Sequence, residues 1–287
     1  MKKSPIRSTS LLLFVISSMA LGQQSVPPTP ENRHPIPIFA LLGPDRGDSV
    51  TIDPILLIDG REIRPVPNPC TETPALHDFQ NRYLKLGTVY SVVFGGVQRG
   101  TASVTKLEGA DWEVGLNSDV PIQGLTMALV VGSPSLDGHG SSRRLPTASE
   151  ENHIEQVAKK ILTSKGVPSA SLTRMRLDQV TAIELNHAPK LVAAVEVERA
   201  DKLGMEYSVF FVADAVSNEN SVIWFQHSKG ETDAEAVYLI DQLDVEKNGT
   251  DSMFVRRVFY ENYSYEVYKN RNGRWVKEFT SEVFGCL

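Results

Sequence analysis

The chain has 287 residues, and its 29 lysines and arginines against 35 aspartates and glutamates give a formal net charge of −6 at pH 7. Hydrophobic residues make up 41% of the chain, which is enough to bury a core and predicts a folded protein. The first 22 residues hold three basic and no acidic residues, so a chain without them would carry −9. This acidic balance argues against nucleic acid or anionic lipid as a partner.

The N-terminus has the pattern of an export signal. Three basic residues precede an apolar run over residues 11–21, and the small residues Ala20 and Gly22 stand where a signal peptidase cleaves. We therefore predict a signal peptide at 1–22 and a secreted or periplasmic protein. The run is shorter than the roughly 20 apolar residues of a membrane helix and no second run follows, so we expect no integral membrane segment in the mature chain.

A proline-rich linker is predicted at 23–37, followed by an antiparallel β domain at 38–132. Polar residues and five prolines dominate the linker. In the β domain, short β-branched and aromatic runs alternate with turn residues. Asp59-Gly60 and the glycine-rich stretch 95–100 each separate two such runs, which predicts two hairpins.

A second, α+β domain is predicted at 147–287, after a Gly/Ser-rich linker at 133–146. Thr147 and Glu150 have the spacing of a helix capping box, and an apolar face follows until Gly166. Long β-type runs come next, and an Asn-Gly turn near residue 272 predicts a terminal hairpin. The fold class is therefore α+β and β-rich, with one capped helix packed on an antiparallel sheet built from two related strand groups.

Those strand groups predict a weak internal duplication. Residues 180–195 can be laid over 238–255, and each copy reads as a strand, an acidic turn and a strand.

The acidic turn of the second copy has alternating oxygen-bearing residues: Asp244-x-Glu246-x-Asn248-Gly249-x-Asp251. It resembles the Asp-x-Asp-x-Asp-Gly loops of the FG-GAP/VCBS type, over about 50 residues. The resemblance implies calcium held by Asp244, Glu246, Asn248 and the Thr250 carbonyl. The loop departs from that family because Glu replaces Asp at the third position and Ser252 stands at the ninth, so the alternatives are calcium or no cofactor and a plain polar turn.

The layout as a whole resembles a group of exported bacterial proteins without an assigned activity. It combines a signal peptide, an Asp-Gly hairpin, an early cysteine, a capped helix and a terminal Asn-Gly hairpin ending in a second cysteine. This resemblance implies a compartment and no activity.

Two cysteines in an exported chain most simply form one disulfide, here Cys70 to Cys286. The alternative is two unpaired thiols.

No motif of the familiar enzyme classes occurs, and no two of the six histidines lie within ten residues of each other. The prediction is therefore a non-catalytic binding or structural protein of the bacterial cell envelope, with a protein, peptide or carbohydrate as partner. An alternative is a secreted hydrolase with a site between the two domains near His139 or His227. A further alternative is the FG-GAP-like calcium module.

The aromatic residues of the terminal hairpin either pack in the core or form a platform for a ligand: Phe259, Tyr260, Tyr263, Tyr265, Tyr268 and Trp275.

Overall fold

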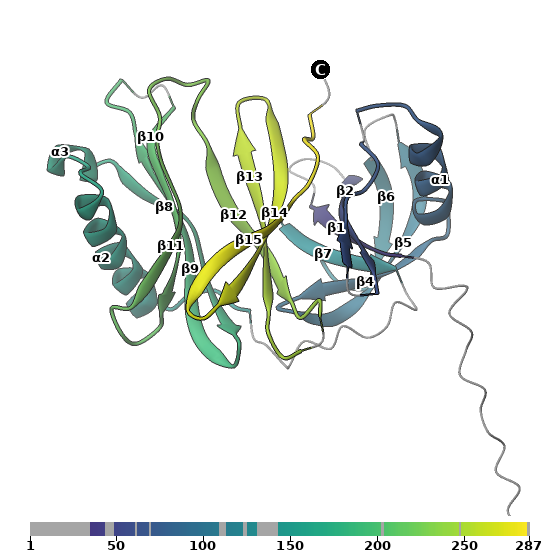
Figure 1. Cartoon of the computed structure of the whole chain (residues 1–287), viewed down its shortest axis with the longest axis horizontal. Helices are drawn as coiled ribbons and strands as arrows, with labels where there is room; N and C mark the ends of the chain where they lie inside the picture. The colour runs from purple at the N-terminus through teal and green to yellow at the C-terminus, as the bar shows by residue number, and fades with distance from the viewer. Residues whose placement is uncertain are drawn as a thin grey trace, which may run out of the picture. The chain divides into compact units, whose positions relative to one another are not determined.

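The computed structural model describes residues 35–285, apart from 44–48, 61, 69, 109–112, 123–124, 131–142, 202–203 and 247. Its first part is an antiparallel sheet in which β1 pairs with both β2 and β7, so that the sheet closes on itself (Figure 1). The strands are β1 (Ile36–Leu42), β2 (Ser49–Asp59), β3 (Glu62–Arg64), β4 (Val89–Phe94), β5 (Val97–Glu108), β6 (Glu113–Ser118) and β7 (Leu125–Val130).

The inside of this closed sheet is filled with apolar side chains, among them Phe39 and Tyr90, whose rings meet edge to face at 5.4 Å. Helix α1 (Pro74–Tyr83) packs against the same core through Leu76, Phe79 and Tyr83. The sequence analysis did not predict this helix. Its start is nevertheless regular, since the Thr73 hydroxyl accepts a hydrogen bond from the Leu76 N–H at 3.1 Å and Pro74 opens the first turn.

Two four-stranded antiparallel meanders follow the closed sheet, one for each predicted strand group. The first meander consists of β8 (Met175–Leu185), β9 (Ala188–Glu198), β10 (Met205–Asp214) and β11 (Asn220–His227). The second meander consists of β12 (Ala236–Leu243), β13 (Ser252–Phe259), β14 (Asn262–Arg271) and β15 (Arg274–Thr280). The strand groups therefore form two sheets and not the single sheet that was predicted.

Helix α2 (Ala148–Ser164) has the predicted capping box and covers one face of the first meander. Thr147 and Glu150 exchange hydrogen bonds between side chain and backbone, and Gly166 ends the helix region at φ 83°. The short helix α3 (Ser169–Leu172) comes next. Helix α2 and the second meander pack on opposite faces of the first meander.

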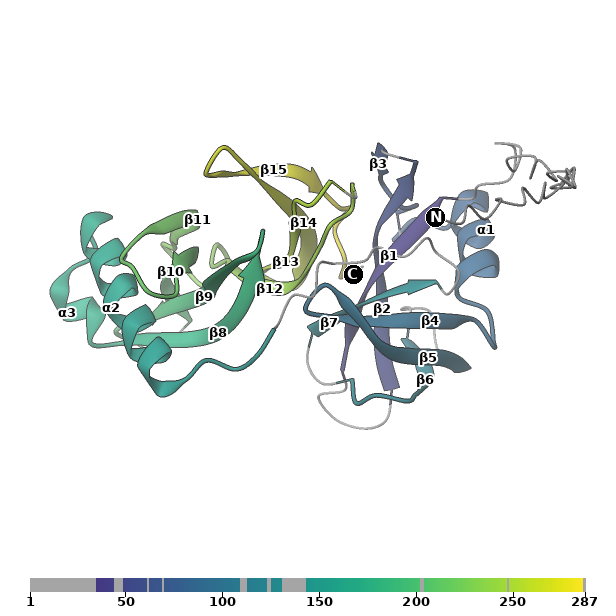
Figure 2. The ribbon, with the colours of Figure 1, turned by 90° about the horizontal axis from the view of Figure 1, so that it is seen from below.

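The second meander lies between the first meander and the closed sheet (Figure 2) and has apolar neighbours on both of its faces. One face packs against the first meander, with Leu239 and Val255 opposite Val192 and Phe210. The other face packs against the outside of the closed sheet, where Phe254 belongs to the same core as residues of β1 and β2. A sheet covered on both faces needs buried side chains on both faces, which explains the nearly continuous burial along β12 and β14.

The β-rich α+β class is confirmed, because strands and antiparallel sheets dominate the described residues. The predicted hairpins are present as well. β2 pairs with β3, β4 with β5 through a turn of two glycines at φ 68° and 73°, and β14 with β15 through Asn272-Gly273. Positive φ at these turns is the reason that glycine and asparagine occur there.

Candidate functional site

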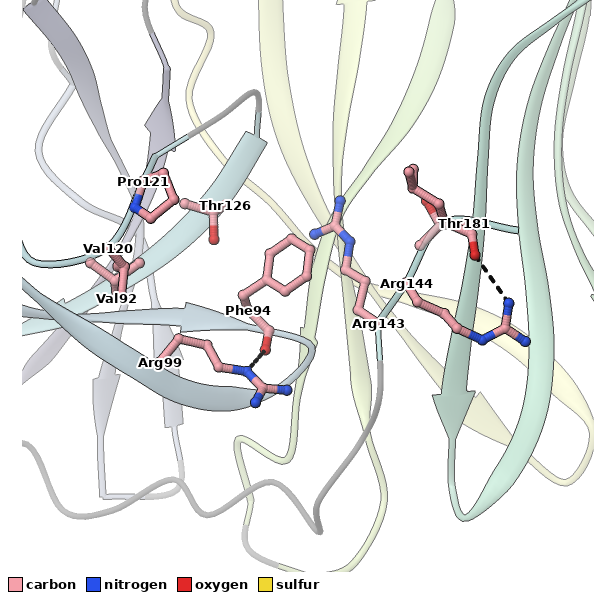
Figure 3. A pocket seen from close by; sticks show the side chains of 10 residues that line it. Val92, Phe94, Arg99, Val120, Pro121, Thr126, Arg143, Arg144 and Thr181 are labelled. Atoms are coloured by element: carbon pink, nitrogen blue, oxygen red, sulfur yellow. Dashed lines mark hydrogen bonds between the residues drawn. The ribbon is translucent and has the colours of Figure 1, made fainter. Parts of the chain in front are cut away.

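A cavity of about 500 Å³ lies where the β4–β5 hairpin faces the segment that leads into α2 (Figure 3). Half of the described residues that line it are apolar and three are arginines. They are Val92, Phe94, Arg99, Val120, Pro121, Thr126, Arg143, Arg144, Leu145 and Thr181. Val92 and Val120 also belong to the core of the closed sheet, so the apolar end of the cavity reaches that core.

Residues close together in the sequence hold the hairpin side of the cavity in place. The turn formed by Gly95 and Gly96 closes the hairpin directly after Phe94. The Arg99 Nε donates to the Phe94 carbonyl at 3.3 Å, which holds the guanidinium over the hairpin. Arg99 makes no ion pair with a carboxylate of the described residues, and it is exposed. Its charge is therefore available to a ligand.

Arg143 forms the opposite wall and is almost fully buried. Its guanidinium lies 4.6 Å from the centre of the Phe94 ring, and the two groups point toward each other in Figure 3. Its Nη1 also donates to the Ile240 carbonyl and lies 3.8 Å from the Asp241 carboxylate. These contacts fix the guanidinium at the cavity wall.

Asp241 lies behind that wall and is fully buried. Its carboxylate accepts the Gly95 N–H at 3.0 Å and the Gln242 N–H at 2.9 Å. Burial raises the pKa of Asp241 to about 6, although Arg143 and the backbone N–H groups act in the opposite direction. The carboxylate thus joins the β4–β5 turn to β12 and holds Arg143 in place.

The third arginine, Arg144, belongs to the α2 cap. Its guanidinium binds both oxygens of Glu150, at 2.8 and 2.7 Å, and its backbone pairs with Ala182 of β8. Hydrogen bonds from Arg144 and Thr147 lower the pKa of Glu150 to about 2. Glu150 therefore neutralises Arg144, and Arg99 is the arginine best placed to meet an added anion.

The chemistry of this lining suits binding. None of the described lining residues is a histidine, cysteine, serine, aspartate or glutamate. The sequence analysis missed Phe94, Arg99 and Arg143 as site residues. The adjacent Arg143 and Arg144 inside the predicted linker were a visible signal, but Asp241 is 146 positions away from Gly95 of the glycine turn.

The predicted calcium loop follows β12. Asp244 is buried, and its two oxygens accept the Asn248 N–H at 3.2 Å and the Gly249 N–H at 2.6 Å. Glu246 pairs with Lys269 and accepts from the Asn248 amide, while the Thr250 N–H donates to Asn248 Oδ1 at 2.9 Å. In the part of the chain that the structure describes, no group of three or more His, Cys, Asp or Glu side chains could hold a metal. Calcium at this loop stays a prediction.

The turns of the two strand groups meet each other. Asn186, in the turn between β8 and β9, donates its N–H to Asp251 at 2.9 Å and accepts the Asp251 N–H at 2.7 Å. This reciprocal pair links the two meanders at one end.

Two of the six aromatic residues of the terminal hairpin are core residues, and two more pack against the core. Tyr265 and Tyr268 are buried, and Tyr263 and Tyr265 both donate to the buried Asp53 of β2, at 2.9 and 2.5 Å. Burial raises the pKa of Asp53 and of both tyrosines. Tyr260 is exposed and Trp275 is partly buried, so an open platform of all six residues does not form.

Of the two histidines of the hydrolase alternative, the structure describes His227, which does not line the large cavity. His139 lies outside the described residues, and His227 is an exposed residue of β11 stacked on Tyr207 at 4.4 Å. A smaller cavity of about 260 Å³ is lined by His187 together with Glu150 and Glu184. Both oxygens of Glu150 are already bound by Arg144, so that carboxylate is not available as a base.

Cys286 also lies outside the described residues, so the disulfide stays a prediction. Cys70 is nonetheless close to the C-terminal segment, with its Sγ 3.7 Å from the Val283 carbonyl. Asn68 and Glu282 lie 3.4 Å apart at the same place.

No helix within the described ranges is long and apolar enough to cross a membrane. None of the protein families, curated proteins or solved structures compared with the chain matches it.

Proposed function

We propose that this chain is an exported, non-catalytic binding protein that holds a small anionic molecule with an apolar body. The lining of the 500 Å³ cavity is the observation that carries this proposal. Its volume is in the range of small-molecule sites, which are mostly apolar with a few fixed polar groups. The proposal of export rests on the signal peptide predicted at 1–22.

The charge of the side chains that line the cavity favours an anionic ligand. The chain is acidic as a whole, yet three arginines and no carboxylate are among the described lining residues. An apolar tail would enter between Val92, Val120 and Leu145, and a carboxylate or sulfate would meet Arg99. A guanidinium binds such groups through two parallel hydrogen bonds.

A hydrolase is the second candidate function, because His187 and Glu184 both line the smaller cavity. Hydrolysis would need His187 to act as a base on a bound substrate. In that case His187→Ala would abolish the hydrolysis of a test ester while leaving ligand binding at the large cavity unchanged.

The test of the binding proposal is calorimetric titration of the mature chain with dodecanoate and with the uncharged dodecanol. We expect saturable one-to-one binding of dodecanoate and about tenfold weaker binding of dodecanol, since tenfold corresponds to one charge-assisted hydrogen bond. The absence of saturable dodecanoate binding would refute the proposal.

Two variants locate the site. Arg99→Gln should weaken dodecanoate binding about tenfold and leave dodecanol binding unchanged. Arg274→Gln removes the same charge from an exposed residue of β15 outside the cavity, and it should change neither. Equal effects of the two variants would mean that general charge, and not this cavity, binds the anion.

A further inference from the structure

A second cavity, of about 430 Å³, lies where the ends of the two meanders meet. The turns between β8 and β9 and between β10 and β11 contribute to it, together with the tip of the β14–β15 hairpin. Its lining is unlike that of the arginine cavity, because amide, hydroxyl and carboxyl groups surround one indole. The residues are Leu185, Asn186, Lys190, Val212, Ala213, Asp214, Glu219, Asn220, Ser221, Asn270, Gly273 and Trp275.

Trp275 is held firmly at this cavity. It is partly buried and packs against the core between the two meanders. The turn before it is fixed, since Asn272 and Gly273 have φ values of 54° and 82° and the Gly273 N–H donates to Asn270 Oδ1 at 2.9 Å. The indole therefore offers a flat apolar surface that costs little side-chain entropy on binding.

Two amide groups beside the indole are oriented by backbone contacts. Asn186 accepts the Asp251 N–H through Oδ1, and Asn270 accepts the Gly273 N–H through Oδ1. Each therefore keeps its Nδ2 donors without a hydrogen bond to a described residue. Because one amide comes from each meander, a ligand between them would be bound by both sheets.

The charges at this cavity are nearly balanced. Lys190 pairs with Asp214 at 3.0 Å, and Asp214 also accepts the Val216 N–H at 3.0 Å and the Ser217 N–H at 2.9 Å. These hydrogen bonds lower the pKa of Asp214, so it remains a charged partner of Lys190. Glu219 is left as an exposed carboxylate that makes no ion pair with a described residue. The cavity would repel an anion through Glu219.

From this arrangement we infer that the second cavity is a binding site for a neutral saccharide. Each sugar hydroxyl both donates and accepts, which matches free amide donors, the Ser221 hydroxyl and the Glu219 carboxylate. The C–H face of a sugar ring would pack on Trp275. The inference is independent of the arginine cavity, because no residue lines both.

The experiment is a calorimetric titration of the mature chain with cellobiose, maltose and N,N′-diacetylchitobiose. We expect at least one of them to bind with a dissociation constant of about 1 mM, as suits one stacked ring and a few hydrogen bonds. Trp275→Ala should abolish that binding, whereas Val276→Ala, at an exposed neighbour in the same strand, should not change it.

A second variant tests the site even if Trp275→Ala fails to fold. Glu219→Ala breaks no ion pair with a described residue, so the fold should be unaffected, and saccharide binding should weaken about threefold to tenfold. No binding of any of the three sugars up to about 50 mM would overturn the inference. Trilysine binding in place of the sugars would also overturn it, and would assign the cavity to a cationic partner.

Discussion

The two meanders have the same order of strands but bury different kinds of side chain. In the described part of the first meander no carboxylate or amino side chain is buried, and its buried polar residues are Thr181 and Ser208. The strands of the second meander bury Asp241, Glu266 and Lys269. Strand order alone therefore does not determine what a sheet can hold inside.

The neighbours of each sheet explain the difference. One face of the first meander is covered by α2, whose contact surface is a stripe of apolar side chains. The second meander faces the closed sheet, and there the β4–β5 turn presents the Gly95 N–H to Asp241. A shift in pairing between Leu239 and Asp241 accompanies this contact, as a bulge that redirects one side chain would. A buried carboxylate is tolerated only where such donors reach it.

The largest difference in stability between the two meanders should follow removal of the predicted disulfide. Cys70→Ser with Cys286→Ser would release the C-terminal end of the second meander from the closed sheet, while the first meander has no cysteine. The chain-entropy model predicts a loss of about 5 kcal/mol in the free energy of unfolding. Urea unfolding measures it. Dithiothreitol should lower the free energy of unfolding of the wild type and leave that of the double variant unchanged. No change in the wild type would mean that no disulfide exists.

Asp241→Ala tests the buried charge of the second meander. It should cost about 3–5 kcal/mol, because it leaves Arg143 and the Gly95 N–H without their partner. The same change in the first meander, Asp178→Ala, should cost under about 1 kcal/mol, since Asp178 is exposed and its ion pair with Arg176, at 3.2 Å, lies at the surface. Urea unfolding of both variants gives the comparison. Equal losses in the free energy of unfolding would show that the difference in burial does not affect stability.

The two regions should respond to pH with opposite signs. The pKa of Asp241 is raised from 3.8 to about 6, so its contribution to stability is present at acidic pH and is lost as the pH rises through 6. The loss should be on the order of 2–3 kcal/mol. The pKa of Glu150, at α2, is lowered from 4.5 to about 2, so its contribution is present above 4.5 and is lost as the pH falls through 2.

Urea midpoints measured from pH 3 to 8 test this. Asp241→Asn should flatten the profile between pH 4 and 6.5, and Glu150→Gln should flatten it only below pH 4.5. An Asp241→Asn profile parallel to that of the wild type would contradict the assignment.

The calcium prediction concerns the acidic turn that follows β12 in the second meander. If Asp244 binds calcium, the ion at ten times its dissociation constant should add about 1.4 kcal/mol to stability, and magnesium should not. The melting temperature with EDTA and with calcium measures this. A rise should disappear in Asp244→Ala, whereas an unchanged wild-type melting temperature rejects the site and leaves the carboxylate to accept the Asn248 and Gly249 N–H groups.

The smallest effect is expected at the α2 cap, on the first meander. Thr147→Ala should cost about 1 kcal/mol, because it removes the hydroxyl that accepts the Glu150 N–H. Thr163→Ala, in the last turn of the same helix, should cost less than about 0.5 kcal/mol. Thermal unfolding compares them, and equal effects would mean that the cap contributes nothing.

Local features of the sequence predicted local structure. The capping box at Thr147 and Glu150 and the Gly-Gly and Asn-Gly turns act through neighbours a few positions away, so the α2 helix and the hairpins could be read directly. Thr73-Pro74 and the spacing of Leu76, Phe79 and Tyr83 also indicated α1, but strand-like runs around them obscured it. The β-rich class followed from the same local patterns.

Only the tertiary structure decided which strands share a sheet and which residues form the cavities. Pairing of β1 with both β2 and β7 closes the first sheet, and no short-range pattern specifies such contacts. Arg143 and Asp241 are 98 positions apart, and their meeting with the Gly95 turn depends on three elements that pack together. The sequence therefore determined the elements, because their causes lie within a few residues, whereas packing between distant segments determined the sites.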